Sequence, residues 1–109
     1  MEMQVLKILS DAMQAGASDI LIVSGGPLSY KTNGRVAHAT EEKLTPDDTE
    51  NLIKQIYALD HQRDLALLLN TGDDDFSFSV SRLGRFRCCA YKQRGSLSAV
   101  LRVVSFSLP

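Results

Sequence analysis

The segment Gly84–Val104, with the sequence GRFRCCAYKQRGSLSAVLRVV, decides the fold of this chain. Arg94-Gly95 separates two alternating stretches and is predicted to form a two-residue turn, with Gly supplying the positive φ that the second position requires. Because side chains alternate between the two faces of a strand, this turn sets the pairing. It places Phe86, Cys88 and Ala90 opposite Val103, Leu101 and Ala99. The sequence therefore predicts a β-hairpin with one wholly apolar face.

The other face of the hairpin carries arginines. The same register pairs Arg87 with Arg102, and Arg85 with Val104. Like charges directly opposite each other are destabilising, so such a pair calls for carboxylates nearby or an anion between the two groups. The planar arginine fork suits phosphate and carboxylate alike. The pattern leaves open an anion site, ion pairs between the two arginines and the acidic run 73–75 on a neighbouring strand, or arginines that simply lie on a solvated face.

Charge is divided unevenly along the chain. All 13 carboxylates precede Phe76, together with six Lys and Arg residues, whereas Phe76 and the residues after it hold six basic residues and no acid. The net charge of −1 therefore hides a split of about −7 and +6. Such asymmetry indicates an anionic partner at one end of the domain.

Length and composition fit a single globular domain, because 109 residues with 44% hydrophobic content can bury an adequate core. No apolar run approaches the length of a membrane span, and the opening MEMQ lacks the basic start of a signal peptide, so we expect a cytosolic protein. Cys88 and Cys89 are adjacent on a strand and point to opposite faces. We therefore expect reduced cysteines, without a mutual disulfide or a zinc site.

The first half of the chain predicts a helix, three strands and a second helix. Apolar residues at helical spacing over Met3–Ala15 indicate a helix that stops at Gly16. Ser18–Val23 is predicted as a strand, and Asn33-Gly34 is a strong hairpin signal between the next two. Thr45 is expected to cap a helix that begins at Pro46. Its inward face is predicted to hold Leu52, Ile53, Ile56 and Tyr57.

The second half adds a short helix and three strands. Asp60 is predicted to cap the short helix, whose Leu65, Leu68 and Leu69 would pack on the sheet. Apolar and Ser residues alternate from Phe76 to Ser81, which indicates a strand with one buried face that leads into the basic hairpin. The order α, β, β, β, α, α, β, β, β predicts an α+β fold, an antiparallel sheet of about six strands with helices on one side.

Catalytic motifs are absent from this sequence. It has no G-x-x-x-x-G-K-[ST] phosphate loop, no G-x-G-x-x-G, no H-E-x-x-H and no nucleophile with a paired base. Three consecutive carboxylates at Asp73, Asp74 and Asp75 cannot all face one point on a strand, so we expect an acidic, solvated or salt-bridged turn there and no metal site. The chain by itself does not look catalytic.

With these elements in order, several segments together resemble one family. They are the opening helix running into GASDILIVSGGPLSYKTNGRV, then DDDFSFSV, then GRFRCCAYKQRGSLSAVLRVV. In this order they are similar to the N-terminal domain of the type IV pilus retraction ATPases, the PilT-like branch of the secretion ATPases. The resemblance implies a PAS-like domain over residues 1–104. It implies that residues 105–109 begin a linker to an absent RecA-like domain that binds ATP and Mg²⁺.

The resemblance also implies roles for particular residues. In secretion ATPases two arginines on the last two strands of this domain reach towards the nucleotide phosphates, and the matching residues here are Arg87 and Arg102. Arg85 would support them, and Arg94 lies at the turn tip. The implied partners are the chain's own RecA-like domain, neighbouring subunits of a homohexamer and an inner-membrane pilus platform protein. The location would be cytoplasmic, peripheral at the inner membrane, and the function that of a regulatory and assembly domain in twitching motility.

Some residues depart from the family pattern. Ile22 stands where a polar residue is frequent, and Cys88-Cys89 replaces a more usual Val-Asn. The loss of Asn at Cys89 removes a hydrogen-bonding side chain from the arginine face. Two other functions remain open. One is a PAS-like sensor of a small molecule, although no haem-type His is evident. The other is a module that binds phosphate or nucleic acid, against which the acidic first two-thirds of the chain would act.

Overall fold

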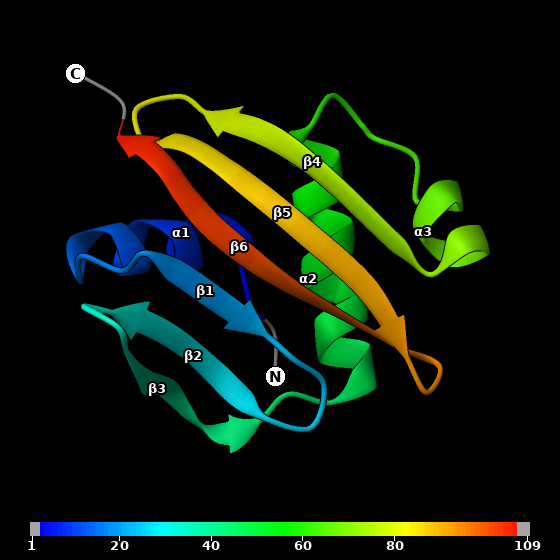
Figure 1. Cartoon of the computed structure of the whole chain (residues 1–109), viewed down its shortest axis with the longest axis horizontal. Coiled ribbons are helices and arrows are strands. Elements are labelled where there is room, and N and C mark those ends of the chain that lie inside the picture. The colour runs from blue at the N-terminus through cyan, green and yellow to red at the C-terminus, as the bar shows by residue number, and fades with distance from the viewer. Residues whose placement is uncertain (1–2, 107–109) are drawn as a thin grey trace.

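The computed structural model describes residues 3–106 of the chain. Within that range the helices and strands follow the order predicted from the sequence (Figure 1). Their bounds are α1 Val5–Gln14, β1 Asp19–Ile22, β2 Pro27–Thr32, β3 Arg35–Lys43, α2 Pro46–Leu59, α3 Ala66–Thr71, β4 Asp73–Val80, β5 Gly84–Gln93 and β6 Ser96–Phe106.

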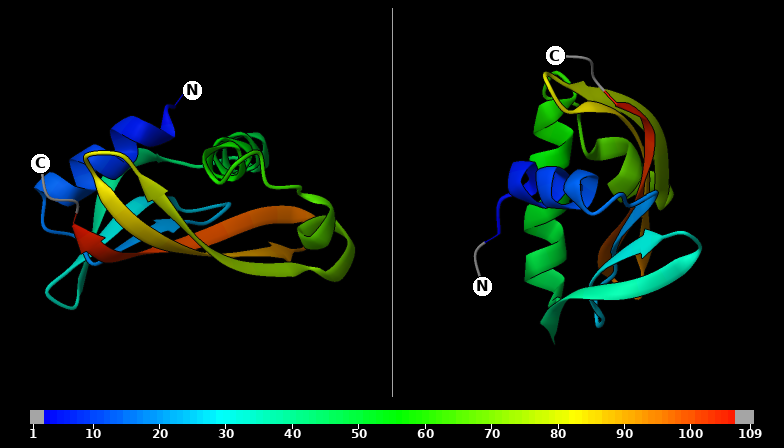
Figure 2. Two further views of the ribbon diagram at one scale, coloured as in Figure 1. Left: turned by 90° about the horizontal axis from the view of Figure 1, so that it is seen from above. Right: turned by 90° about the vertical axis from the view of Figure 1, so that its left-hand side faces the viewer.

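One sheet contains these six strands in the order β3-β2-β1-β6-β5-β4, and neighbouring strands are antiparallel. β1 and β6 come from opposite ends of the chain and pair in the middle of the sheet. Figure 2 shows α1 and α2 together on one face of the sheet, and Figure 1 shows α3 beside the start of β4. The predicted α+β fold, with an antiparallel sheet of six strands and helices on one side, is confirmed.

Two hairpins turn where the sequence predicted. Asn33-Gly34 has φ values of 52° and 79°, and Arg94-Gly95 has φ values of 55° and 82°. Two successive residues with positive φ make a turn whose twist matches that of the flanking strands. Gly at the second position adopts this conformation without a steric penalty, and this sets the register of both hairpins.

The β5–β6 ladder has the predicted register through its centre. Phe86, Cys88 and Ala90 lie opposite Val103, Leu101 and Ala99, and Arg87 lies opposite Arg102. A bulge between Arg85 and Phe86 shifts the far end of the ladder by one residue. Arg85 therefore lies opposite Ser105, and the predicted pairing with Val104 is wrong.

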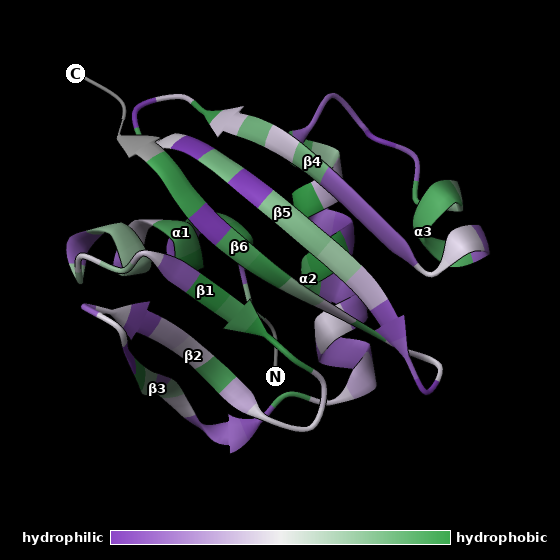
Figure 3. Ribbon diagram, in the orientation of Figure 1, coloured by the Kyte–Doolittle hydropathy of each residue, from purple (hydrophilic) through white to green (hydrophobic). Residues whose placement is uncertain are grey.

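The hydrophobic core fills the space between the sheet and the helices α1 and α2. The predicted inward face of α2 is confirmed, and its residues are at most 1% exposed: Leu52, Ile53, Ile56 and Tyr57. Opposite them, β1 and β6 supply apolar side chains such as Ile20 and Leu101, and Figure 3 shows both strands as mainly hydrophobic. Burying one large apolar side chain contributes about 1.5–3 kcal/mol relative to leaving it exposed. This helix layer therefore fixes which face of each strand remains open.

A capping box starts α2 at the predicted residue. The Thr45 hydroxyl accepts a hydrogen bond from the Asp48 amide at 3.1 Å, and the Asp48 carboxylate accepts one from the Thr45 amide at 2.9 Å. These bonds lower the pKa of the Asp48 carboxyl, the backbone bond being the larger cause. Pro46 occupies the first helical position, where its missing N–H loses no hydrogen bond.

Three local predictions need correction. Asp60 caps the C-terminal end of α2 and not the start of α3, where the Asp64 carboxylate accepts a hydrogen bond from the Ala66 amide at 2.9 Å. The turn after α2 extends further than predicted, so α3 begins later and has only six residues. Of its predicted packing residues Leu68 is buried, but Leu69 is about half exposed.

Candidate functional site: an arginine pair on the open face of the sheet

Arg87 and Arg102 project from adjacent strands on the face of the sheet that α1 and α2 leave open. Their neighbours Phe86, Cys88 and Leu101 are fully buried towards the helices, so alternation sends the two arginines to the opposite side. Their side chains are 55% and 69% exposed. The structure thus brings the two predicted site residues together on one solvent-facing surface.

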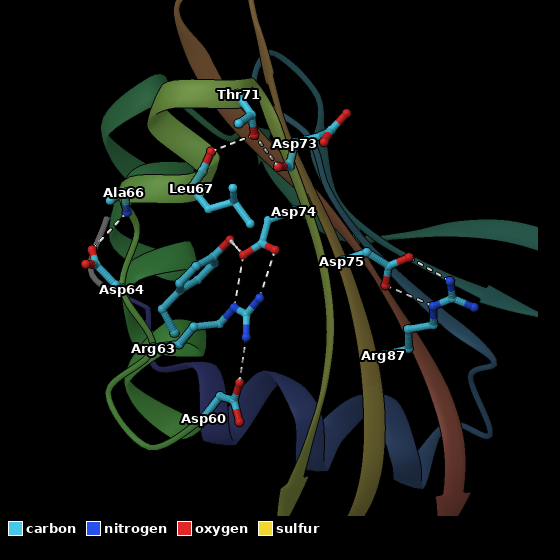
Figure 4. A network of polar contacts seen from close by, with 11 residues as sticks. Asp60, Arg63, Asp64, Ala66, Leu67, Thr71, Asp73, Asp74, Asp75 and Arg87 are labelled. Atoms are coloured by element: carbon cyan, nitrogen blue, oxygen red, sulfur yellow. Dashed lines mark hydrogen bonds and ion pairs between the residues drawn. The ribbon is translucent and has the colours of Figure 1, made fainter.

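Arg87 forms a two-pronged ion pair with Asp75 of β4. Its Nε donates to Oδ1 at 3.0 Å and its Nη2 donates to Oδ2 at 2.6 Å, as Figure 4 shows. Asp75 lies opposite Cys89 and Arg87 lies opposite Ser77, so the guanidinium reaches a diagonal neighbour. The hydrogen bonds from Arg87 are the main reason that the pKa of the Asp75 carboxyl is lowered, and Asp75 raises the pKa of Arg87. The predicted ion pair with the acidic run is confirmed for this arginine.

Arg102 is held more loosely, and by a different carboxylate. Its nearest acidic group is Asp19 on β1, which lies directly opposite it, with Nε and Oδ2 separated by 3.7 Å. That separation allows electrostatic attraction but exceeds hydrogen-bond length. The Asp19 carboxylate instead accepts a hydrogen bond from the Ser18 hydroxyl at 2.7 Å. Arg102 therefore lies on a solvated face beside Asp19, and the alternative of an ion pair with the run 73–75 is wrong for this arginine.

A shallow hollow of about 170 Å³ lies between these groups. Its lining residues are Asp19, Arg87, Cys89, Val100 and Arg102. Two guanidinium groups at one rim keep several N–H donors directed at solvent, which is an arrangement that can hold a phosphate or carboxylate. Asp19 and Asp75 beside them partly neutralise the positive charge of the two arginines.

Arg85 and Arg94, the other two arginines considered for the anion site, lie in different parts of the hairpin. Arg85 extends on the same open face, and its Nη1 donates to the Ser79 hydroxyl at 3.3 Å. Arg94 sits at the tip of the β5–β6 turn, beside a separate polar hollow with Ser24, Ser96 and Ser98. The structure therefore groups Arg85 with the pair and leaves Arg94 at the far end of the hairpin.

Sequence reasoning missed a second acid–arginine contact, which is buried. Asp74 is 6% exposed and accepts hydrogen bonds from Arg63 Nε at 3.0 Å, Arg63 Nη2 at 2.9 Å and the Tyr57 hydroxyl at 2.8 Å. The guanidinium of Arg63 also lies 4.4 Å from the ring centre of Phe76 and 3.6 Å from the Asp60 carboxylate. Figure 4 shows Asp74 directed towards Arg63, away from the side on which Asp75 meets Arg87.

This network ties the connection after α2 to the edge strand β4. Arg63 lowers the pKa of the Asp74 carboxyl, while burial and the bond to Asp74 raise the pKa of Tyr57. One signal in the sequence could have revealed it. Phe76 and Phe78 face the core, and a period of two places Asp74 on that same face. The acidic run is therefore the start of a strand with a buried member rather than a turn, whereas the predicted salt bridges are present at Asp74 and Asp75.

The cysteines occupy opposite faces, as predicted. Cys88 is buried in the core, and burial raises the pKa of its thiol, whereas Cys89 is exposed in the hollow. Among residues 3–106, no group of three or more His, Cys, Asp or Glu side chains is arranged to hold a metal ion.

A groove of about 300 Å³ opens elsewhere, between α1 and the β2–β3 hairpin. It is lined by residues that include Lys7, Ile8, Asp11, Leu28 and Tyr30. Burial, with a smaller contribution from Asp11, raises the pKa of Tyr30, whose hydroxyl lies 3.5 Å from the Ile8 carbonyl oxygen. The volume of the groove is at the lower end of the range for small-molecule sites.

Comparison with known proteins identifies similar chains. The type IV pilus ATPase PilU of Pseudomonas aeruginosa strain PAO1 is 33% identical over 107 residues, which are 98% of this chain and 27% of PilU. The pilus retraction ATPase PilT of the same organism is 29% identical over 94% of this chain and 29% of PilT. A crystal structure of the pilus retraction motor PilT with bound ADP has a TM-score of 0.82 and 35% identity, over 99% of this chain and 31% of that one. No protein-family model matches the sequence.

The fold and these similarities define an N-terminal domain of the secretion ATPase class. Within that class the chain is similar to PilU and PilT, so it is a PilT-like domain. It spans less than a third of the length of each of these relatives.

Proposed function

We propose that this domain regulates and assembles a hexameric type IV pilus motor ATPase, and that Arg87 and Arg102 reach towards the phosphates of ATP. One observation carries the proposal. Arg87 and Arg102 are exposed and lie opposite each other on β5 and β6, on the open face of a domain that matches PilT-like proteins over nearly all its length. Residues 1–104 would form the domain, and residues 105–109 would begin the linker to a RecA-like domain. Of these, β6 includes 105 and 106, and 107–109 lie outside the described residues.

The chemistry follows from charge. Phosphoryl transfer spreads negative charge over the oxygens of the transferred group, and an arginine directed at those oxygens stabilises the transition state. ATP and Mg²⁺ would bind in the RecA-like domain, and this chain would contribute only the two guanidinium groups. Arg85, on the same face, would add positive charge at longer range, and Arg94 would take part only if the turn tip met a neighbouring subunit.

The partners of the motor are part of the same proposal. The domain would contact its own RecA-like domain and the neighbouring subunits of a homohexamer, and the hexamer would act in the cytoplasm on an inner-membrane platform protein. The pilus ATPases among its relatives support this assignment. In residues 3–106, no helix is both long and apolar enough to cross a bilayer.

The test uses the complete motor protein that carries this domain. We expect Arg87→Ala and Arg102→Ala each to lower steady-state ATP turnover by about 10²-fold, because a transition-state donor is removed. Phosphate release measures turnover, and light scattering after size exclusion measures assembly, which should not change. Arg35→Ala, an exposed arginine on the edge strand β3, is the matched control and should leave turnover unchanged. Normal turnover in both site variants would refute the proposal, as would a coding sequence without a phosphate loop after residue 109.

The groove beside α1 supports a second candidate, a PAS-like sensor of a small molecule. Native mass spectrometry of the purified chain tests it, since a bound molecule would add a discrete mass that disappears when Tyr30→Ala opens the groove. A nucleic-acid module has less support, because Asp19 and Asp75 interrupt the basic surface around the arginine pair and would repel a long polyanion.

A further inference from the structure

The ion pair between Arg87 and Asp75 occupies one of the two forks through which a guanidinium can hold two oxygens of a phosphate. The Nε and Nη2 donors form the fork that recognises two oxygens of one anion, and both donate to the Asp75 carboxylate. A phosphate that binds Arg87 in the same two-pronged way must therefore replace the carboxylate. Arg102 carries no comparable restraint, since its Nε is 3.7 Å from Asp19.

The position of Asp75 also determines where the guanidinium points. Asp75 lies on the edge strand β4, whereas Arg102 lies on β6, on the other side of β5. The diagonal contact draws the Arg87 side chain towards β4 and away from Arg102. This reduces repulsion between two arginines that the register places directly opposite each other.

Exchange of the carboxylate for another anion should be easy. The two side chains are 55% and 49% exposed, so water and salt screen their attraction and solvate both groups after separation. A polyphosphate carries several negative charges, while Asp75 carries one, so it can displace the carboxylate and also attract Arg102.

We propose that Asp75 is a positioning residue for Arg87, which it holds away from Arg102 until a polyphosphate displaces the carboxylate and joins the two arginines. The inference rests on the proposed function, because it assumes that this pair meets phosphate. Because an incoming anion must displace Asp75, only anions with more than one negative charge would bind in the hollow, and singly charged carboxylates would not.

The matched control is Asp73, which lies two residues before Asp75 on β4. Asp73 is on the same strand and the same exposed face, and its change to Asn removes the same charge. In the described residues its carboxylate forms no ion pair with an arginine. A comparison of Asp75→Asn with Asp73→Asn therefore separates loss of the ion pair from a general change in charge.

The experiment measures binding of sodium tripolyphosphate to the 109-residue chain by isothermal titration calorimetry, at about 50 mM salt, where screening is weak. We expect Asp75→Asn to tighten binding by about threefold to tenfold, and Asp73→Asn by less than about twofold. Asp75→Glu should restore wild-type affinity, and Arg87→Gln should abolish the gain in the Asp75→Asn background. The arginine Nε–H signal of Arg87 in NMR spectra should shift on titration, a response that a purely structural role would not give.

The possible failures can be told apart. If Arg87→Gln and Arg102→Gln weaken binding but Asp75→Asn binds no tighter than Asp73→Asn, the positioning role is wrong and the arginine site stands. If the two Gln variants bind as wild type does, or if no variant binds at all, the arginine pair is not a phosphate site. That result would overturn both the proposed function and this inference.

Discussion

Asp74 and Asp75 are neighbours on β4, and each forms a two-pronged ion pair with an arginine, yet their surroundings differ. The Asp74 side chain is 2% exposed and lies among Arg63, Tyr57 and the core, whereas the Asp75 side chain is 49% exposed on the open face. The two carboxylates have nearly the same hydrogen-bond geometry. Burial, together with the added bond from Tyr57, therefore makes one pair part of the fold and leaves the other exchangeable.

The largest expected difference is between Asp74→Asn and the same change at Asp75. Asp74→Asn leaves Arg63 with only the Asp60 carboxylate, 3.6 Å away, and disturbs the bond from Tyr57. Removing one partner of a buried pair typically costs 3–5 kcal/mol, and we expect about 2–4 kcal/mol here because Arg63 keeps some contact with water. Urea unfolding followed by circular dichroism measures this loss. A loss below about 1 kcal/mol would show that the network does not hold β4 to the helix layer.

The same network should make stability depend on pH, and the sign follows from the lowered pKa of Asp74. Its contribution is fully present above the unfolded value, near 3.8, and is lost as pH falls through the lower folded value. The difference in unfolding free energy between wild type and Asp74→Asn should therefore be constant near neutral pH and shrink below pH 3.8. A difference that persists unchanged in strong acid would contradict an ionised Asp74.

A smaller effect is expected for Tyr57→Phe. This change removes one hydrogen bond to Asp74 and keeps the ring that packs edge-on against Phe76, whose centre is 4.8 Å away. Asp74 retains both bonds from Arg63, so the loss of unfolding free energy should be about 1 kcal/mol. Thermal unfolding measures it. Tyr57→Leu serves as the comparison, since it also removes the ring and should lose more stability. A Tyr57→Phe variant as stable as wild type would deny the hydroxyl a role.

The smallest effect is expected for Asp75→Asn on stability. The exposed ion pair is screened and its partners are readily solvated, so the thermal midpoint should shift by less than about 2 °C. Differential scanning fluorimetry of wild type and variant checks this. A shift as large as that of Asp74→Asn would mean that Asp75 holds the strands together, and the contrast between the two carboxylates would disappear.

Much of the fold could be predicted because its signals are local. The Arg94-Gly95 turn and the period of two were enough to place Arg87 opposite Arg102, and the capping box at Thr45 located the start of α2. The bulge at Arg85 could not be predicted, because alternation continues on both sides of it. The start of α3 was also missed, because the helix begins after Leu65 without a side-chain cap from that residue, and Asp60 ends α2 instead.

The candidate site divides in the same way. The side of the sheet on which each arginine lies follows from the sequence, because a strand sends alternate residues to opposite faces whatever surrounds it. The partners were decided by tertiary structure. Asp19 lies near Arg102 because β1 pairs with β6, a strand from the opposite end of the sequence. Arg63 contacts Asp74 from the irregular turn after α2. Strand order and burial depend on how distant segments pack, and that packing determines which carboxylate is fixed and which can be displaced.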